Sequence, residues 1–338
     1  MRIDLILESN NSPERIAELG QLAEANGIGA IWISGMLDGR DPFAVFTKLA
    51  LTTSRIRMGP IAVSPFELHP LMMAKSLLTL NEYAQGRAQM VVGGGGGTAT
   101  AMNLPLERRV GRVRETLDIL RLAARGEPLD YEGELYQIRN YNPFWANSHP
   151  PAVYVGANRE QMIKMGARHA ERMMLSDKMV VQVAETKALI SATRQRAGLP
   201  PEPYGMTNFW AWHVKRDRAA AVREARIWLA LRGVLLRKNH EYFMSPEDCD
   251  LVDEKRGVFF QALRKRSPEI PGVPDRIIDQ LIDNLTSTAS VDEIDSELER
   301  LRAFAAAGLT EIALRIYEEP EETIRLLGER VVPALADA

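Results

Sequence analysis

Short runs of apolar residues alternate with longer stretches of helical periodicity along the whole chain. The short runs are rich in β-branched and aromatic side chains and are bounded by turn residues, as buried parallel strands are. The longer stretches repeat apolar positions every three to four residues, as amphipathic helices do. Eight such strand-and-helix units can be counted in the sequence. This order predicts an α/β fold in which helices cover a parallel sheet.

The predicted strands occupy residues 3–7, 30–33, 56–63, 88–92, 152–155, 173–175, 206–214 and 311–316. Ser12 and Asp41 are placed to cap the helices after the first two strands, and Pro13 suits the first position of a helix. Eight units in 338 residues, where about 250 residues are typical, predict a (β/α)8 TIM barrel with insertions.

The extra length has two places in this scheme. We interpret residues 1–338 as a single barrel domain with insertions at about 126–149 and 233–290. The first insertion contains a hairpin-like stretch at 131–139, and the second is predicted to form helices and loops. The second also carries the basic run Arg264-Lys265-Arg266, which we interpret as a solvated helix end because no long block of charge accompanies it.

Composition narrows the class of protein. Hydrophobic residues make up 46% and charged residues 26%, which is typical of globular chains. The formal net charge of -3 offers no positive field for a polyanion, so nucleic acid is not an expected partner. The single cysteine, Cys249, excludes an internal disulfide, and no apolar run is long enough for a membrane helix. We therefore expect a soluble cytoplasmic protein without a membrane partner.

In a barrel of this kind, the active site is built from residues that follow the strands at their carboxyl ends. The first three strands place Glu8, Ser34 and the stretch 61–64 at this end. The fourth strand is followed by five consecutive glycines and a threonine: Gly93, Gly94, Gly95, Gly96, Gly97 and Thr98. Backbone N–H groups without Cβ atoms beside them can close on a phosphate or a flat ring. We therefore expect this loop to contact a ligand.

Three later strands add further candidates. The turn Gly156-Ala157-Asn158-Arg159 opens a helix, and a helix amino terminus suits an anion. His213 ends the stretch Trp210-Ala211-Trp212-His213, and Arg315 and Tyr317 lie at the last strand. These positions extend the predicted ligand face around the barrel.

Motifs for the common nucleophilic and metal-dependent chemistries are missing from the sequence. It contains no Gly-x-Ser-x-Gly, no His-Glu-x-x-His and no phosphate-binding Walker loop. The five histidines are scattered through different units, and no pair has helical metal-binding spacing, so no metal site is predicted. Few acid or base groups remain, which indicates that a cofactor supplies the chemistry while the protein supplies orientation.

Several of these stretches together resemble one family. The segment 59–97, with Ser64-Pro65, His69-Pro70, Gly86-Arg87 and the glycine run, is similar to the luciferase-like family of flavin- and deazaflavin-dependent barrel enzymes. Residues 31–34, 150–157 and 308–333 continue the likeness, which covers nearly the whole chain except the second insertion. The pattern resembles most the branch that uses coenzyme F-420, a 5-deazaflavin, exemplified by methylenetetrahydromethanopterin reductases.

The resemblance implies roles for particular positions. It implies a bulge with a non-prolyl cis peptide bond at Ile61-Ala62, near Val63, that supports the back of the cofactor ring. It also implies that the glycine loop and the turn 156–158 hold the cofactor's ribityl and phosphate groups. Members that oxidise alcohols carry Asp-His after the second strand, where this chain has Gly35-Met36. Alcohol oxidation with a histidine base is therefore not expected here.

These observations lead to a first hypothesis and two rivals. The first is an oxidoreductase that moves a hydride between reduced coenzyme F-420 and a small or medium apolar organic substrate. In this hypothesis Met36 lies beside the ring, and Glu8 or His213 supplies any proton. The rivals are an FMN-dependent monooxygenase fed by a separate flavin reductase, and a catalytically silent barrel that binds the cofactor. Leu71, Met72, Leu77 and Leu78 form an apolar surplus that also predicts a homodimer.

Overall fold

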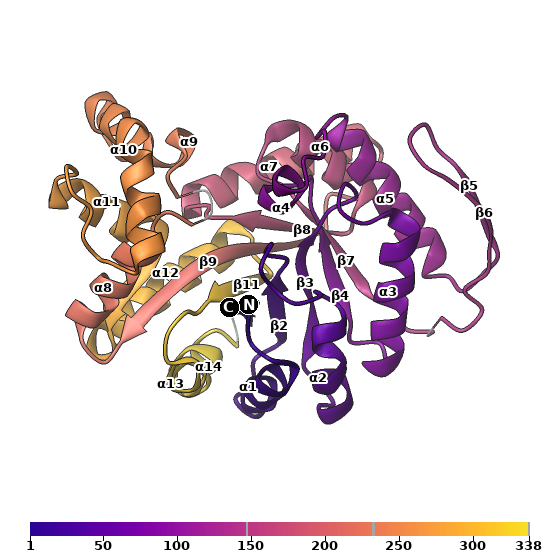
Figure 1. The fold of residues 1–338 in the computed structure, drawn as a ribbon, viewed down its shortest axis with the longest axis horizontal. Helices are drawn as coiled ribbons and strands as arrows, with labels where there is room; N and C mark the ends of the chain where they lie inside the picture. The colour runs from indigo at the N-terminus through magenta and orange to yellow at the C-terminus, as the bar shows by residue number, and fades with distance from the viewer. Residues whose placement is uncertain (147, 232–233, 337–338) are drawn as a thin grey trace.

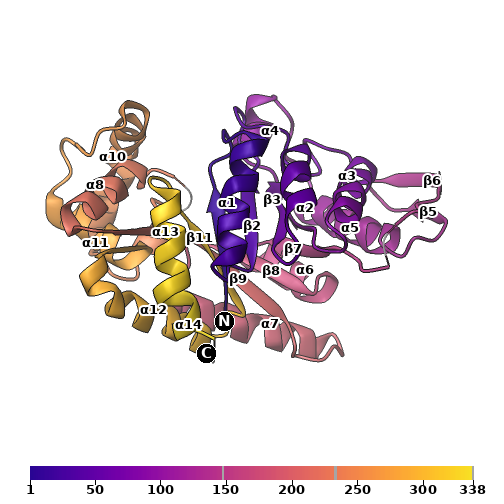
Figure 2. The ribbon, with the colours of Figure 1, turned by 90° about the horizontal axis from the view of Figure 1, so that it is seen from below.

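A closed ring of eight parallel strands forms the centre of the structure, a computed structural model that describes residues 1–146, 148–231 and 234–336. The strands follow one another in the order β1-β2-β3-β4-β7-β8-β9-β11, and β11 pairs with β1. Helices surround the ring, and β9 extends beyond it toward a helical lobe (Figures 1 and 2). The predicted (β/α)8 barrel is therefore confirmed. No helix in the described ranges is long and apolar enough to cross a membrane.

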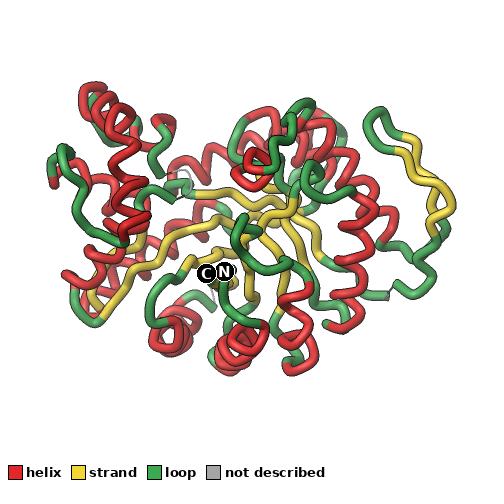
Figure 3. The backbone as a smooth tube through the Cα atoms, viewed as in Figure 1, coloured by secondary structure: helices red, strands yellow, loops and turns green. Residues whose placement is uncertain are grey.

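The strands lie at the predicted places, with small differences at their ends (Figure 3). Their bounds are β1 Arg2–Leu7, β2 Ala30–Ser34, β3 Arg57–Val63, β4 Gln89–Val92, β5 Leu129–Glu132, β6 Gln137–Tyr141, β7 Ala152–Gly156, β8 Arg172–Ser176, β9 Gly205–Lys215, β10 Thr286–Ser290 and β11 Glu311–Arg315. Strands β5 and β6 form the antiparallel hairpin expected in the first insertion.

Helix α1 begins directly after its predicted cap, Ser12, whereas a short turn separates Asp41 from α2, which begins only at Thr47. The bounds are α1 Pro13–Ala25, α2 Thr47–Thr52, α3 Pro70–Tyr83, α4 Gly97–Ala101, α5 Arg109–Ala123, α6 Glu160–His169, α7 Val180–Arg196, α8 Arg218–Trp228, α9 Arg237–His240, α10 Pro246–Lys265, α11 Asp275–Leu285, α12 Ile294–Ala307, α13 Pro320–Leu326 and α14 Val332–Ala334, with short turns at Ala44–Phe46, Val291–Glu293 and Leu327–Val331. The Ser12 hydroxyl accepts the Arg15 N–H, and Asp41 accepts the N–H groups of Phe43 and Ala44.

The second insertion differs from its prediction in one respect. It contains helices α9, α10 and α11, as expected, but it ends in β10, which pairs in parallel with the second half of β9. The pairing arises because β9 has eleven residues and continues beyond its pairing with β11, which ends at Ala211, so its second half is available to β10. The sequence of β10, Thr-Ser-Thr-Ala-Ser, lacks the apolar residues that mark a strand. Gly233, where the predicted insertion begins, lies outside the described residues.

The lobe formed by α8 to α11 has an apolar core of its own. Val252 and Phe259 of α10 pack there with Ile278 and Leu281 of α11. The barrel has a separate interior cluster that includes Ile6, and a larger layer between strands and helices. The lobe is thus held against the barrel and not merged with its core. The single-domain interpretation of residues 1–338 stays a prediction.

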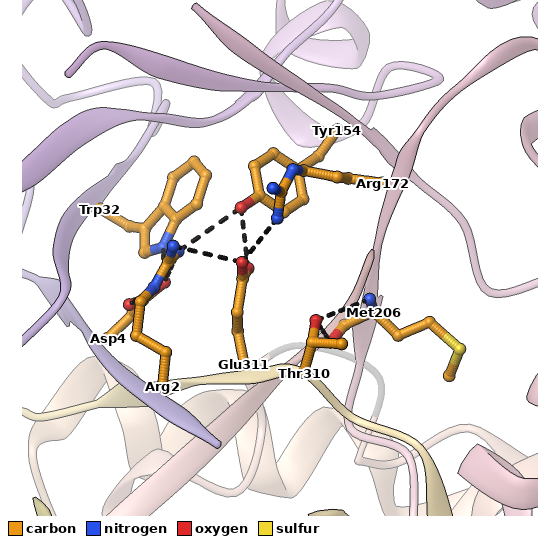
Figure 4. Close-up of polar contacts among 8 residues, drawn as sticks. All are labelled: Arg2, Asp4, Trp32, Tyr154, Arg172, Met206, Thr310 and Glu311. Atoms are coloured by element: carbon orange, nitrogen blue, oxygen red, sulfur yellow. Dashed lines mark hydrogen bonds and ion pairs between the residues drawn. The ribbon is translucent and has the colours of Figure 1, made fainter. Parts of the chain in front are cut away.

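Charged side chains close the amino-terminal end of the ring (Figure 4). The buried carboxylate of Asp4 accepts the indole N–H of Trp32 at 3.1 Å. Glu311 accepts the Tyr154 hydroxyl at 2.7 Å and lies 2.8 Å from Arg172. Buried charges persist when they are paired and hydrogen-bonded in this way. The network fills this end, so the carboxyl ends of the strands are the open side of the barrel.

Two of the four apolar residues predicted for a dimer surface lie inside the protein. Leu77 and Leu78 are 1% and 2% exposed and belong to the barrel's own core. Leu71 is partly buried against the β5–β6 hairpin, and Met72 is 45% exposed. Most of the apolar side chains that were expected to form a dimer surface on α3 are therefore buried within one chain. The homodimer stays a prediction that rests on Met72 and its surroundings.

Candidate active site

A groove runs across the carboxyl ends of the barrel strands. One part, here called the β3–β8 cavity, has a volume of about 740 Å³. The other part, called the β1–β11 cavity, has a volume of about 760 Å³ and lies between the barrel and the helical lobe. Phe209 of β9 lines both, so the two cavities adjoin. A groove of this size suits a cofactor and a substrate side by side.

The two cavities have different linings. The β3–β8 cavity is lined by Ile61, Ala62, Val91, Gly94, Gly95, Arg108, Arg109, Val110, Gly111, Gly156, Ala157, Asn158, Arg159, Gln161, Met162, Met174, Leu175, Ser176 and Phe209. The β1–β11 cavity is lined by Glu8, Ser9, Asn10, Ser34, Gly35, Met36, Leu37, Asp38, Gly97, Thr98, Phe209, Trp228, Leu231, Leu263, Arg264, Arg266, Arg315 and Tyr317. The first set follows the middle strands, and the second joins strands β1, β2 and β11 to the lobe.

The glycine loop forms the boundary between the two cavities. A Cβ atom at Gly93 would lie 2.9 Å from the Cβ of Ala62, so only glycine allows this approach of β4 to β3. Gly95 has a φ of 81°, which also favours glycine. At Gly96 and Gly97, by contrast, a Cβ atom would meet no other atom within 4 Å. Their bare backbone leaves open space that a flat ligand can occupy.

The end of β3 supports the same region from the other side. The Ile61-Ala62 peptide bond is cis, and the pairing of β3 with β4 shifts register between Ile61 and Val63. Both features are those that the resemblance implied for this position. Ile61 and Ala62 line the β3–β8 cavity, whereas Val63 packs into the core between the sheet and the helices. The structure thus separates Val63 from the other residues predicted to touch the cofactor.

Three arginines line the β3–β8 cavity. They are Arg108, Arg109 and Arg159, of which Arg108 forms an ion pair with Glu134. Helix α6 begins directly after Arg159, and no side chain caps its first turn. The N–H groups of an uncapped first turn and nearby guanidinium groups both favour an anion. Gly156, Ala157 and Asn158 lie beside this helix end, as predicted, so the arrangement fits a phosphate.

Two lysines extend the positive region past the cavity. Lys238 donates to the carbonyl oxygen of Asn158 at 3.4 Å, and Lys178 is 8% exposed. Burial, followed by repulsion from Lys238, lowers the pKa of Lys178. Burial, followed by repulsion from Arg159, lowers the pKa of Lys238. These cations lie close together at a free-energy cost that a bound polyanion would offset.

The β1–β11 cavity holds the residues predicted after the first two strands. The Glu8 carboxylate accepts from Arg315 at 2.6 Å. Met36 is 48% exposed and lines this cavity together with Ser34. The Thr98 hydroxyl donates to the carbonyl oxygen of Gly35 at 3.3 Å, which ties the glycine loop to the segment after β2. The structure therefore brings Glu8, Ser34, Met36 and Thr98 together.

His213 does not join this group. It is 1% exposed and absent from the lining of either cavity. Its Nδ1 atom lies 2.7 Å from the Glu224 carboxylate, which also lies 2.9 Å from Lys215. The His213 ring stacks on Tyr317 with centroids 5.2 Å apart, and Tyr317 lines the β1–β11 cavity. His213 thus supports the cavity wall from behind, and its catalytic role stays a prediction.

Some lining residues were missed by the sequence reasoning. Arg108 and Arg109 lie at the start of helix α5, and two adjacent cations at a helix start were a signal that the sequence reasoning did not use. Glu67 lines a small hollow of about 260 Å³ under the glycine loop, where burial raises its pKa. Phe209 carried no such signal, because an aromatic residue within a strand is ordinary core composition.

Comparison with known proteins places this geometry in a family. A sequence profile described as luciferase-like monooxygenase matches residues 2–311. The chain belongs to this family. Members need not share one reaction, because function depends on the site and not on the fold.

Individual members of this luciferase-like family give closer comparisons. The chain is 25% identical to a 5,10-methylenetetrahydromethanopterin reductase of Archaeoglobus fulgidus, over 93% of this chain and 94% of the relative. It is 23% identical to an F-420-dependent glucose-6-phosphate dehydrogenase of Nakamurella multipartita, over 96% and 93%. The solved F-420-dependent tetrahydromethanopterin reductase of Methanopyrus kandleri superposes with a TM-score of 0.79 at 21% identity, covering 98% of this chain and 99% of that one. This last likeness shows a shared fold.

Proposed function

We propose that this chain is an oxidoreductase that transfers a hydride between coenzyme F-420 and a small organic substrate. The observation that carries the proposal is the β3–β8 cavity, whose lining joins Gly94 and Gly95 of the glycine loop to three arginines, with the open backbone of Gly96 and Gly97 in the adjoining hollow. Similarity to F-420-dependent proteins over nearly the whole chain supports it. The adjoining β1–β11 cavity then receives the substrate.

The residues present fit the proposed cofactor. Gly96 and Gly97 leave room for a flat ring against the backbone, next to Ala62. Arg108, Arg109 and the amino terminus of α6 would bind its phosphate. When bound, the deazaflavin supplies the carbon centre that gives or accepts a hydride. The protein's part is to orient the ring between the two cavities and to exclude water from it.

The extended positive region favours coenzyme F-420 over FMN. The deazaflavin coenzyme continues beyond its phosphate into a chain of carboxylates, whereas FMN ends at its phosphate. Lys238 donates to the carbonyl oxygen of Asn158, beside the amino terminus of α6, and Lys178 lies near it, but neither lines the cavity, so they would meet the part of F-420 beyond its phosphate. Binding of the longer anion would relieve the repulsion among these cations.

A cofactor titration tests the proposal. We expect coenzyme F-420 to bind at least tenfold more tightly than FMN, about 1.4 kcal/mol, when either is added to the purified protein and its absorbance or fluorescence is followed. Lys238→Gln is expected to weaken F-420 binding while leaving FMN binding unchanged. Tighter FMN binding, with oxygen uptake once a flavin reductase is added, would instead support the monooxygenase. Binding of F-420 without turnover of any substrate would support the silent barrel.

The position of Met36 gives a separate prediction. A thioether does not titrate at neutral pH, so Met36→Leu, which conserves volume and apolar character, is expected to keep F-420 affinity within about twofold. Met36→His places an ionisable ring at the same point, and its affinity for F-420 is expected to change with pH between about 6 and 7. Titrations of both variants from pH 5 to 8 provide the measurement. If the histidine variant behaves like the leucine variant at every pH, Met36 lies away from the ring.

A further inference from the structure

The basic run in the second insertion lies at the substrate side of the groove. Arg264 and Arg266, at the carboxyl end of α10, line the β1–β11 cavity, whereas Lys265 between them does not. All three side chains are exposed. The run is therefore a solvated helix end, as interpreted, but two of its three residues also line a cavity. The lobe directs the two arginines toward the same cavity that Met36 lines.

Arg266 is held in a particular orientation. It ends α10 in a left-handed conformation with φ of 51° and ψ of 39°. Its guanidinium group lies over the Trp228 ring at 4.0 Å from the centroid, and Trp228 stacks in turn on Tyr317 at 4.2 Å. Stacking uses the flat face of a guanidinium and leaves its in-plane N–H groups available as a planar set of donors. Such a set matches the two oxygens of an acid group.

The charges of the lining leave these arginines without an acidic partner. Arg264 and Arg266 form no ion pair within the described part of the chain, whereas Arg315 is paired with Glu8. Among the described residues of the lining, Asp38 is the other acidic side chain. These residues thus supply three cations and two carboxylates, an excess of one positive charge.

Apolar walls surround this charge. Met36, Leu231, Leu263 and Phe209 line the cavity along with the stacked rings of Trp228 and Tyr317. A cation beside apolar walls interacts with an anion more strongly than it does in open water, because the local dielectric constant is lower. The lining therefore suits a molecule with an apolar body and an acid group at one end.

We propose that the substrate of this enzyme is an organic anion, whose carboxylate or phosphate binds Arg264 and Arg266 while its apolar body contacts Met36 and Phe209. This inference rests on the proposed function, because it takes the β1–β11 cavity as the substrate's place. It replaces the wholly apolar substrate expected from the sequence. The reacting carbon would lie near Met36, toward the glycine loop, and the acid group would lie at the lobe.

Binding of a matched pair of aromatic probes tests the proposal without the cofactor. Isothermal titration of the full chain with 2-naphthoate and with its neutral analogue 2-naphthamide, in low salt, compares the same ring with and without charge. We expect the acid to bind at least tenfold more tightly than the amide, and 2-naphthyl phosphate to follow the acid. Added salt is expected to reduce the affinity for both anions but not for the amide.

Three single variants locate the binding. Arg264→Ala and Arg266→Ala are each expected to weaken 2-naphthoate binding fivefold or more, and Lys265→Ala, the matched control on the same turn, is expected to change it less than twofold. Arg264 forms no hydrogen bond or ion pair within the part of the chain that the structure describes, so Arg264→Ala should leave the fold intact and report on binding alone. Equal affinity for acid and amide would overturn the proposal, as would anion binding that both arginine variants leave intact. The cofactor titration does not involve these residues, so its failure would be a separate result.

Discussion

Replacing Glu224 by alanine is expected to lower the free energy of unfolding by about 3–5 kcal/mol. Glu224 is 1% exposed and lies 2.7 Å from His213 and 2.9 Å from Lys215, which is 7% exposed. Its carboxylate also accepts the backbone N–H of Glu318 at 3.1 Å. Removal of the carboxylate would leave the Lys215 charge buried without this partner. Chemical denaturation at pH 7 measures the difference.

The loss of stability should depend on pH. Burial by itself raises the pKa of Glu224, but the hydrogen bond and charge of His213, together with Lys215, hold it below its ordinary value of about 4.3. A carboxylate with a lowered pKa stabilises the folded state fully above its ordinary pKa, and this contribution is lost as pH falls through the folded value. The difference in stability between the wild-type protein and Glu224→Ala should therefore narrow as pH falls through the lowered pKa of Glu224.

Glu322 provides the control for this variant. It forms an exposed pair with Arg216, whose side chains are 52% and 85% exposed. Exposed pairs of this kind contribute about 0–1 kcal/mol, so Glu322→Ala should change stability little at any pH. Equal effects of the two variants would mean that the buried network around His213 does not stabilise the barrel.

Regular features of the fold could be predicted from the sequence because each has a local cause. The strand at 206–214 is observed as Gly205–Lys215, since its tryptophans and alternating pattern are strong signals. The start of α1 after Ser12 follows from side-chain capping, which needs only neighbouring residues, whereas Asp41 caps a short turn that precedes α2. The β10 strand could not be predicted, because it forms only where β9 leaves an edge, a fact of tertiary structure.

Some residues of the candidate site could also be predicted from the sequence, and others could not. The glycine loop and the turn 156–158 could be recognised because they follow strands, and in a parallel barrel all strands end on one face. His213 satisfies the same rule, yet its side chain is buried against Glu224 and Tyr317. Arg264 and Arg266 are more than 160 residues from the glycine loop in sequence, on a lobe whose packing no local pattern reveals. Only the three-dimensional structure shows that these two residues of a distant insertion line the β1–β11 cavity.

Replacing Gly96 by valine is expected to weaken cofactor binding at least tenfold, about 1.4 kcal/mol, with the fold unchanged. Gly96 lines the hollow under the glycine loop, together with Ala62 and Glu67. Its φ of −150° is negative, unlike that of Gly95, and a Cβ atom there meets no protein atom within 4 Å. The added methyl groups would fill space that the proposed ring requires. Gly95 is less suitable for this test, because its φ of 81° would make valine distort the loop itself.

Gly257→Val is the matched control for this prediction. That glycine is exposed on α10, and a Cβ atom there also meets nothing within 4 Å, but it lines neither cavity. Gly257→Val should therefore bind coenzyme F-420 like the wild-type protein, and both variants should show thermal unfolding close to wild type. Weaker binding in Gly96→Val alone would place the cofactor against the loop. Unchanged affinity in Gly96→Val would mean that the five glycines serve the packing of β4 on β3 at Gly93, where the Cβ atom would contact Ala62, and not the ligand.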